Sequence, residues 1–167
     1  IAKRGAKVLV VDADPQGTAT RWAAAAEEET PFPASVIGLS AASGKVHQEV
    51  KKFVNDYDFI LIDCPPAADS PVPQSALLIS DLAIVPVIPS PPDLWASVGI
   101  KQVIEHVQTI NETLEARLVI NQLTNTNLAK DTQEILDDFG IMRLPPIRQR
   151  NIYRQSAIYG SSVFDLS

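Results

Sequence analysis

Four short stretches of the chain are almost continuously apolar and rich in β-branched residues. They cover residues 7–11, 59–62, 82–87 and 117–120. None of them alternates between apolar and polar positions, so the pattern predicts strands that are buried on both faces. Strands of that kind are typical of a parallel sheet that is covered by helices.

Segments with a helical spacing of apolar residues separate these strands. They cover residues 18–28, 45–55, 74–80, 94–110 and 128–139, and Gly140 follows the last of them as a stop signal. The first five residues predict the last turn of a helix that is closed by Gly5. This alternation of strand and helix predicts a three-layer α/β fold with a mainly parallel sheet, in which ligands bind at the carboxyl ends of the strands.

Composition narrows the class of protein. The chain has 167 residues, of which 46% are hydrophobic and 20% are charged, and we expect residues 1–167 to form a single domain. The net charge of −6 means that any contact with nucleic acid depends on a local basic patch. The single cysteine, Cys64, has no partner for an internal disulfide, and no apolar run approaches the ~20 residues that cross a bilayer. We therefore expect a cytoplasmic protein without a membrane partner.

Aspartates follow two of the predicted strands. Asp12 and Asp14 come directly after the first strand, with Pro15 and Gly17 shaping the turn into the next helix, and Asp63 ends the run FILID. A carboxylate in this position favours a nearby cation or polarised water, because its desolvation is costly. An apolar strand that ends in Asp is also the general Walker B pattern, in which the carboxylate holds Mg²⁺ through water beside a nucleotide. One such aspartate alone is more often the N-cap of a helix, but three of them predict one cluster at the sheet edge.

The stretches VDADPQGTAT, YDFILIDCPP and SDLAIVPVIPSPPDLWASVG resemble the ParA family of partition ATPases, which are P-loop proteins with a deviant Walker motif. The resemblance covers essentially the whole chain and is nearest to the short plasmid type such as ParF. It implies that the complete protein is an ATP hydrolase that uses ATP and Mg²⁺ and dimerises when ATP is bound. Its ATP-bound and ADP-bound conformations would be the functional output, and hydrolysis would reset the state.

The resemblance also implies roles for the acidic residues. Asp14 would orient the attacking water, and Asp12 would support the network of Mg²⁺ and water. Asp63 would be the Walker B aspartate, and residues 64–68 would form the second switch, which senses the γ-phosphate. A carboxylate that aligns water and a cation that neutralises phosphate oxygens can suffice for phosphoryl transfer to water.

Three further residues would contact the nucleotide if the resemblance holds: Gly17, Asn121 and Pro145. A turn or cap at the end of a strand is an equally good interpretation of Asn121. The segment PVIPSPPDLWASVG resembles the proline-rich stretch that shapes the dimer and higher assemblies in ParF-like proteins. As an ordinary rigid loop between a strand and a helix, the same segment would need no partner.

Residues 141–160 are basic within an acidic chain, because they contain Arg143, Arg148, Arg150 and Arg154 and no acidic residue. ParA relatives use basic residues in this part of the chain to hold DNA of any sequence through its phosphates. The resemblance therefore implies that Arg148, Arg150 and Arg154 bind DNA and that the protein associates with the nucleoid. Alternatively, some of these arginines pair with carboxylates of the chain itself.

One motif of the family does not occur in the sequence. The phosphate loop, KGGxxxKT in pattern form, supplies most of the phosphate site through its backbone amides and lysines, and neither Gly17 nor Gly44 stands in a context that replaces it. We expect a first strand and a phosphate loop to precede residue 1 and a last helix to follow Ser167. We also expect residues 1–167 alone to be inactive.

The predicted function is that of an ATPase that positions plasmid or chromosome cargo through a centromere-binding or adaptor protein. A MinD-like ATPase that cycles on and off membranes is an alternative on the same fold. A non-catalytic interaction module that kept the scaffold is a second alternative.

Overall fold

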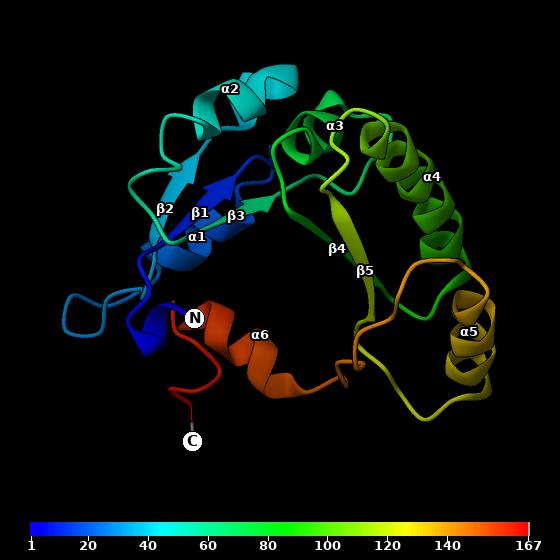
Figure 1. Ribbon diagram of the computed structural model, residues 1–167. Helices are drawn as coiled ribbons and strands as arrows, with labels where there is room; N and C mark the ends of the chain where they lie inside the picture. Colours follow the sequence, from blue (N-terminus) through cyan, green and yellow to red (C-terminus); the bar gives the residue numbers. More distant parts are fainter. Residues whose placement is uncertain (167) are drawn as a thin grey trace. The chain divides into compact units, whose positions relative to one another are not determined.

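A computed structural model describes residues 1–166, which form two compact units (Figure 1). The first unit contains Ile1–Pro65, Pro71–Ala76 and the chain from Asn151 onward, and the second contains Pro66–Ser70 and Leu77–Arg150. Each unit has its own parallel sheet, so each is described by itself.

The first unit is built on a parallel sheet with the strand order β2-β1-β3. Its strands are β1 (Val8–Asp12), β2 (Ser35–Gly38) and β3 (Phe59–Asp63). The central strand β1 is apolar on both faces and almost completely buried, as the sequence pattern predicts. Its register with β3 pairs the first residues of both strands and also their last residues, which are Asp12 and Asp63. The two strands therefore end at the same edge of the sheet.

Short helices accompany this sheet. They are η1 (Ala2–Arg4), α1 (Thr18–Ala24), η2 (Ser40–Lys45), α2 (Val46–Val50) and α6 (Asn151–Ile158). Gly5 closes η1 in the left-handed conformation, with φ 92°, as the sequence predicts. Gly17 adopts φ 64° directly before α1, where a residue with a Cβ would be strained.

The second unit contains the parallel pair β4 (Leu82–Val87) and β5 (Glu115–Ile120). Helix α4 (Pro91–Gln108) and helix α5 (Asn127–Asp137) belong to it, and helix α3 (Pro71–Leu77) ends in it. Its core is a continuous cluster of buried aliphatic side chains, the largest of which are Ile104, Leu118, Ile120 and Leu136.

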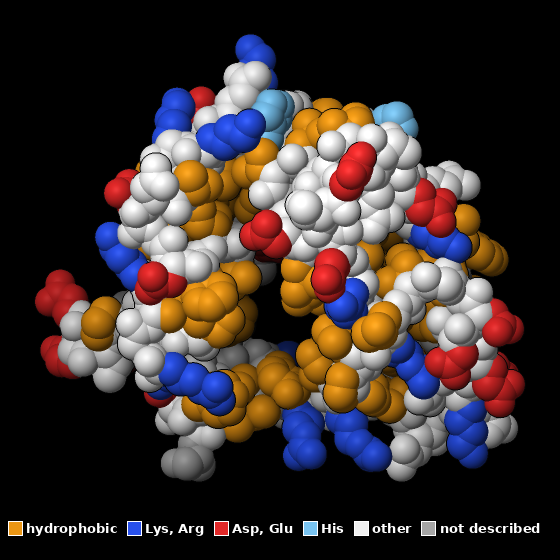
Figure 2. All heavy atoms as spheres, viewed as in Figure 1, with side chains coloured by type: hydrophobic (Ala, Val, Ile, Leu, Met, Phe, Trp, Pro, Cys, Tyr) orange, Lys and Arg blue, Asp and Glu red, His pale blue; other side chains and the backbone are white. Residues whose placement is uncertain are grey.

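The α/β class with parallel sheets is thus confirmed, but one detail of the sequence prediction is wrong. β3 and β4 are not buried on both faces, since Phe59 and Leu61 are 48% and 49% exposed, and Leu82 and Ile84 are 48% and 54% exposed. Among the described residues, β3 pairs only with β1 and β4 only with β5. Hydrophobic side chains also reach the surface over much of the face in Figure 2. Within residues 1–166, no helix is long and apolar enough to span a membrane.

Candidate functional site

The carboxyl edge of the first sheet gathers the three predicted acidic residues. Asp12 and Asp63 are register partners at the ends of β1 and β3. The backbone N–H of Ala13 donates to the carbonyl of Asp63 at 2.9 Å, which continues the pairing one residue past β1. Asp14 therefore leaves the sheet at the same edge, and its charge acts on Asp63. The predicted cluster of Asp12, Asp14 and Asp63 is present.

Asp12 is the buried member of this cluster, with 1% of its surface exposed. Its Oδ2 accepts a hydrogen bond of 2.8 Å from the backbone N–H of Thr20 in the first turn of α1. Its Oδ1 is buried and has no hydrogen-bond partner among the described residues. Buried carboxylate oxygens almost always accept a hydrogen bond or bind a cation, so the unpartnered Oδ1 indicates a site for a water or a cation.

Asp14 belongs to the turn between β1 and α1. Its Oδ1 accepts from the backbone N–H of Gln16 at 2.9 Å, and its carbonyl accepts from the N–H of Gly17 at 3.0 Å. This is the local bonding by which Asp initiates turns, and it holds the half-buried carboxylate at the sheet edge. We call residues 12–17 the acidic loop.

The electrostatics of this edge are those of negative charges that lie close together. Burial, followed by the charges of Asp12 and Asp14, raises the pKa of the Asp63 carboxyl. Burial, followed by the charges of Asp63 and Asp14, raises the pKa of the Cys64 thiol to about 11, so Cys64 is a thiol and not a nucleophilic thiolate at neutral pH. A divalent cation at this edge would offset the repulsion among the carboxylates.

The residue types suit Mg²⁺ that is bound partly by other groups. Within residues 1–166, no three His, Cys, Asp or Glu side chains are arranged to hold a metal ion by themselves. Mg²⁺ usually keeps several waters and takes only one or two carboxylates, with substrate phosphates completing its coordination. The edge therefore fits Mg²⁺ held through water next to a phosphate group, and Asp12 and Asp63 are the carboxylates that would hold it.

Two of the residues predicted to contact nucleotide, Asn121 and Pro145, belong to the second unit. Asn121 directly follows β5, and its Oδ1 accepts from the N–H of Gln122, which has φ 53°. The side chain thus stabilises a turn, which is the alternative that the sequence left open. Pro145 lies in a segment that runs alongside β5. In this segment, the N–H of Leu144 donates to the carbonyl of Leu118 and the N–H of Ile147 donates to the carbonyl of Ile120.

The basic residues 141–160 contain one arginine in an ion pair and three exposed arginines. Arg143 forms an ion pair with Asp137 at 3.0 Å. Arg148, Arg150 and Arg154 are exposed, and no acidic side chain within residues 1–166 pairs with them. Arg154 lies on α6 in the first unit, whereas the other two belong to the second.

Two groups of this site could not be found from sequence patterns. The backbone N–H of Thr20 reaches Asp12 only because α1 begins at Thr18, and no side-chain type encodes that contact. Trp22 donates to one backbone carbonyl in α6 and to one just after it, both more than 130 residues away in the sequence. No local pattern carries a signal for a contact of that length.

Parallel strands joined by helices, with carboxylates at the carboxyl ends of two adjacent strands, are typical of α/β folds that bind ligands at this edge of the sheet. An AAA-domain family model matches residues 32–120, which is more than half of the chain. The chain belongs to this family and is a ParA-family P-loop ATPase by sequence. The predicted ParA resemblance is thereby confirmed.

One curated relative is the Maintenance of carboxysome distribution protein A of Halothiobacillus neapolitanus. It is 33% identical over 168 residues, which cover 99% of this chain and 76% of that protein. Among solved structures, the ATP complex of a Cyanothece McdA variant has a TM-score of 0.77 at 16% identity, covering 98% of this chain and 80% of the other. The septum site-determining protein MinD of Pyrococcus horikoshii with Mg-ADP has a TM-score of 0.70 at 21% identity, covering 98% and 77%. Both structures are similar in fold.

Proposed function

We propose that this chain is the larger part of an ATPase that positions cargo inside the cell, with hydrolysis governed by the acidic loop and Asp63. The observation that carries the proposal is the buried Oδ1 of Asp12, which has no hydrogen-bond partner among the described residues and lies where two further carboxylates act on one another. A magnesium nucleotide would satisfy that oxygen and offset the repulsion. When bound, Mg²⁺ would neutralise charge on the phosphate oxygens.

The surroundings of Asp12, Asp14 and Asp63 support the role that the family resemblance implies for each of them. Asp12 is fixed by the Thr20 amide and buried, which suits support of ordered water next to the metal. Asp14 is half-buried and held by the turn, which suits the alignment of a water for attack. Asp63 ends β3 in the Walker B position, which suits the water-mediated hold on Mg²⁺.

The phosphate loop of this ATPase would come from a preceding segment of the full-length protein. The chain spans 76% of the length of its carboxysome-distribution relative. β3 also has one unpaired edge among the described residues, with Phe59 and Leu61 half exposed, which is an unusual state for an apolar strand. We propose that a further parallel strand at this edge leads into the phosphate loop.

The direct test is ATP hydrolysis by the full-length protein. We expect turnover that requires Mg²⁺, stops on chelation and returns when Mg²⁺ is restored. A full-length protein that binds no nucleotide would favour the non-catalytic interaction module and would overturn the proposal.

The role of Asp63 predicts a change in metal requirement. Asp63→Asn is expected to raise the Mg²⁺ concentration for half-maximal ATP turnover by about 10- to 100-fold, the usual effect of losing a group that orients the water around a metal. The measurement is a Mg²⁺ titration of turnover at saturating ATP. Asp56→Asn is the matched control, because Asp56 is an exposed residue in the turn before β3. Equal Mg²⁺ requirements for Asp63→Asn and the wild type would remove Asp63 from the metal site.

We further propose that the ATP-bound dimer holds DNA of any sequence through Arg148, Arg150 and Arg154. These exposed side chains have no acidic partner among the described residues, so their charge is available to phosphates. DNA binding of this kind predicts that the protein associates with the nucleoid. We also propose that a centromere-binding or adaptor protein is its partner and stimulates hydrolysis. The name of the 33% identical relative makes the carboxysome a candidate cargo beside plasmids and chromosomes.

Replacing Arg150 and Arg154 together with alanine is expected to weaken binding to all DNA sequences alike. The slope of log affinity against log salt should fall by about 2, close to one unit for each phosphate that the variant no longer neutralises. Fluorescence anisotropy with two unrelated duplexes over a salt series measures both effects. Lys51→Ala with Lys52→Ala removes the same charge from another exposed site and serves as control. An unchanged slope in the arginine variant would exclude these two residues from the DNA surface.

A further inference from the structure

Two hydrogen bonds join the acidic loop to helix α1. The N–H of Thr20 donates to Asp12 Oδ2 at 2.8 Å, and the N–H of Arg21 donates to the carbonyl of Gly17 at 3.0 Å. Both donors belong to the helix, and both acceptors belong to the loop. Any rotation or shift of α1 therefore moves the carboxylate of Asp12 or breaks the hydrogen bond that holds it.

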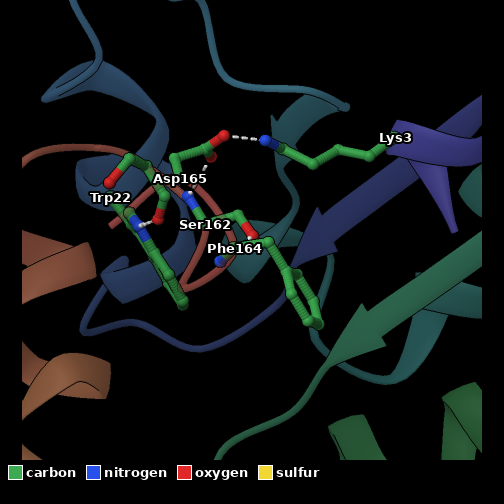
Figure 3. Close-up of polar contacts among 6 residues, drawn as sticks. Lys3, Trp22, Ser162, Phe164 and Asp165 are labelled. Atoms are coloured by element: carbon green, nitrogen blue, oxygen red, sulfur yellow. Dashed lines mark hydrogen bonds and ion pairs between the residues drawn. The ribbon is translucent and has the colours of Figure 1, made fainter. Parts of the chain in front are cut away.

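Helix α1 is in turn fixed by Trp22 (Figure 3). Its indole Nε1 donates to the carbonyls of Ser156 and Ser161, each at 3.1 Å. The indole ring also meets the ring of Phe32 edge to face, with centroids 6.0 Å apart. The half-buried indole thus attaches α1 to the end of α6.

The acceptor segment is itself held closely against α1. Gly160 lies in the turn that follows α6, with φ 58°, and the N–H of Ser161 donates back to the carbonyl of Ser156 at 2.9 Å. A Cβ at Gly160 would lie 2.1 Å from the backbone nitrogen of Ala26, so only glycine allows this approach. Beyond it, Asp165 accepts from the N–H of Ser162 at 3.0 Å and pairs with Lys3 (Figure 3).

We infer that Trp22 is a positioning residue through which the end of α6 sets the arrangement of the acidic loop. The path has two contacts: the indole fixes α1 to the carbonyls of Ser156 and Ser161, and α1 fixes Asp12 through Thr20. All of these groups belong to the first unit. The next step rests on the proposed function. Helix α6 also carries Arg154, so DNA bound at α6 and nucleotide bound at the acidic loop would each change the affinity for the other.

The test that needs no ligand is amide hydrogen exchange in the full-length protein. Trp22→Phe keeps an aromatic ring beside Phe32 and removes the indole N–H. We expect the Thr20 and Gln16 amides, which bond the two loop carboxylates, to exchange about 2- to 10-fold faster, as the loss of one hydrogen bond predicts. Phe32→Leu is the matched control, because it disturbs the ring contact and keeps the N–H donor.

Two patterns of exchange would overturn the inference. One is faster exchange at the end of α6 with unchanged Thr20 and Gln16 amides. The other is an equal rise at every amide, including that of Val10 in the central strand β1, which would mean a general loss of stability.

A second measurement leaves Trp22 intact, so it remains informative if Trp22→Phe does not fold. The chain has two tryptophans, and Trp95 on α4 is 74% exposed. In full-length protein in which Trp95 and any tryptophan outside residues 1–167 are replaced by phenylalanine, the emission of Trp22 is expected to shift when Mg²⁺ with a non-hydrolysable ATP analogue is added, and again with duplex DNA. Binding is scored separately by a labelled nucleotide. Binding without a change in Trp22 emission would overturn the inference, whereas absence of nucleotide binding would overturn the proposed function and leave the exchange data to decide on Trp22.

Discussion

Replacing Asp14 with asparagine is expected to lower the ATP turnover of the full-length protein by on the order of 10²- to 10⁴-fold, the usual contribution of a group that handles the attacking water. Asparagine keeps an oxygen that can accept from the Gln16 N–H and so preserves the turn, but it removes the negative charge. ATP binding should not change, because Asp14 is proposed to act on water and not on the nucleotide. Single-turnover hydrolysis and equilibrium nucleotide binding separate these two effects.

Asp14→Ala adds a second comparison, since it removes the charge and the turn acceptor together. If the charge is the functional property, the alanine and asparagine variants should be equally slow. If the asparagine variant turns over like the wild type and only the alanine variant is slow, Asp14 shapes the loop and does not orient water. Asp56→Asn controls for the loss of one negative charge.

Gly160→Ala is expected to lower the free energy of unfolding by about 2–5 kcal/mol, the largest stability effect that we predict for a single methyl group. The left-handed conformation at φ 58° costs an alanine roughly 1–2 kcal/mol. The added Cβ would also stand 2.1 Å from Ala26 N and 2.4 Å from Ala25 C, and overpacking of this kind costs about 1–3 kcal/mol. Urea denaturation followed by circular dichroism measures the change.

Gly140→Ala is the matched control for the steric part of this effect. Gly140 has φ 76°, but its nearest neighbour would be the flexible end of Lys101 at 3.7 Å. This variant should lose only the conformational part, about 1–2 kcal/mol. Equal losses in the two variants would mean that the chain beyond α6 moves away from α1 at little cost, and would weaken the case for a fixed contact there.

Helix α4 begins earlier than its apolar spacing predicts, because capping residues set its first turn. The apolar spacing predicts a helix from residue 94, but α4 begins at Pro91. The side chain of Ser90 accepts from the Asp93 N–H, and prolines fit the first helical positions because those N–H groups have no partner inside the helix. Strand β2 is missing from the prediction because it has only four residues and is half-buried, so it lacks a strong apolar signal.

The exposed faces of β3 and β4 have a different cause. Continuous apolar runs indicate burial on both faces, but burial requires a neighbour, and the neighbour is not encoded in the run itself. Leu61 and Ile84 have strongly apolar surroundings in sequence and are about half exposed in the structure. A pattern therefore predicts which side chains would be stable in a core, and the packing partners decide whether they reach one.

The amino-acid sequence by itself determined the parallel α/β class, the family and the presence of Asp12, Asp14 and Asp63 at one sheet edge. These properties follow from short-range patterns, because apolar runs define parallel strands and such strands end at a common edge. Only the tertiary structure decided that Asp12 Oδ1 is buried without a partner among the described residues and that Trp22 joins α1 to the end of α6. The burial of Asp12 and the backbone acceptors of Trp22 depend on segments far apart in the sequence that come together only in the folded chain, so no local pattern predicts them.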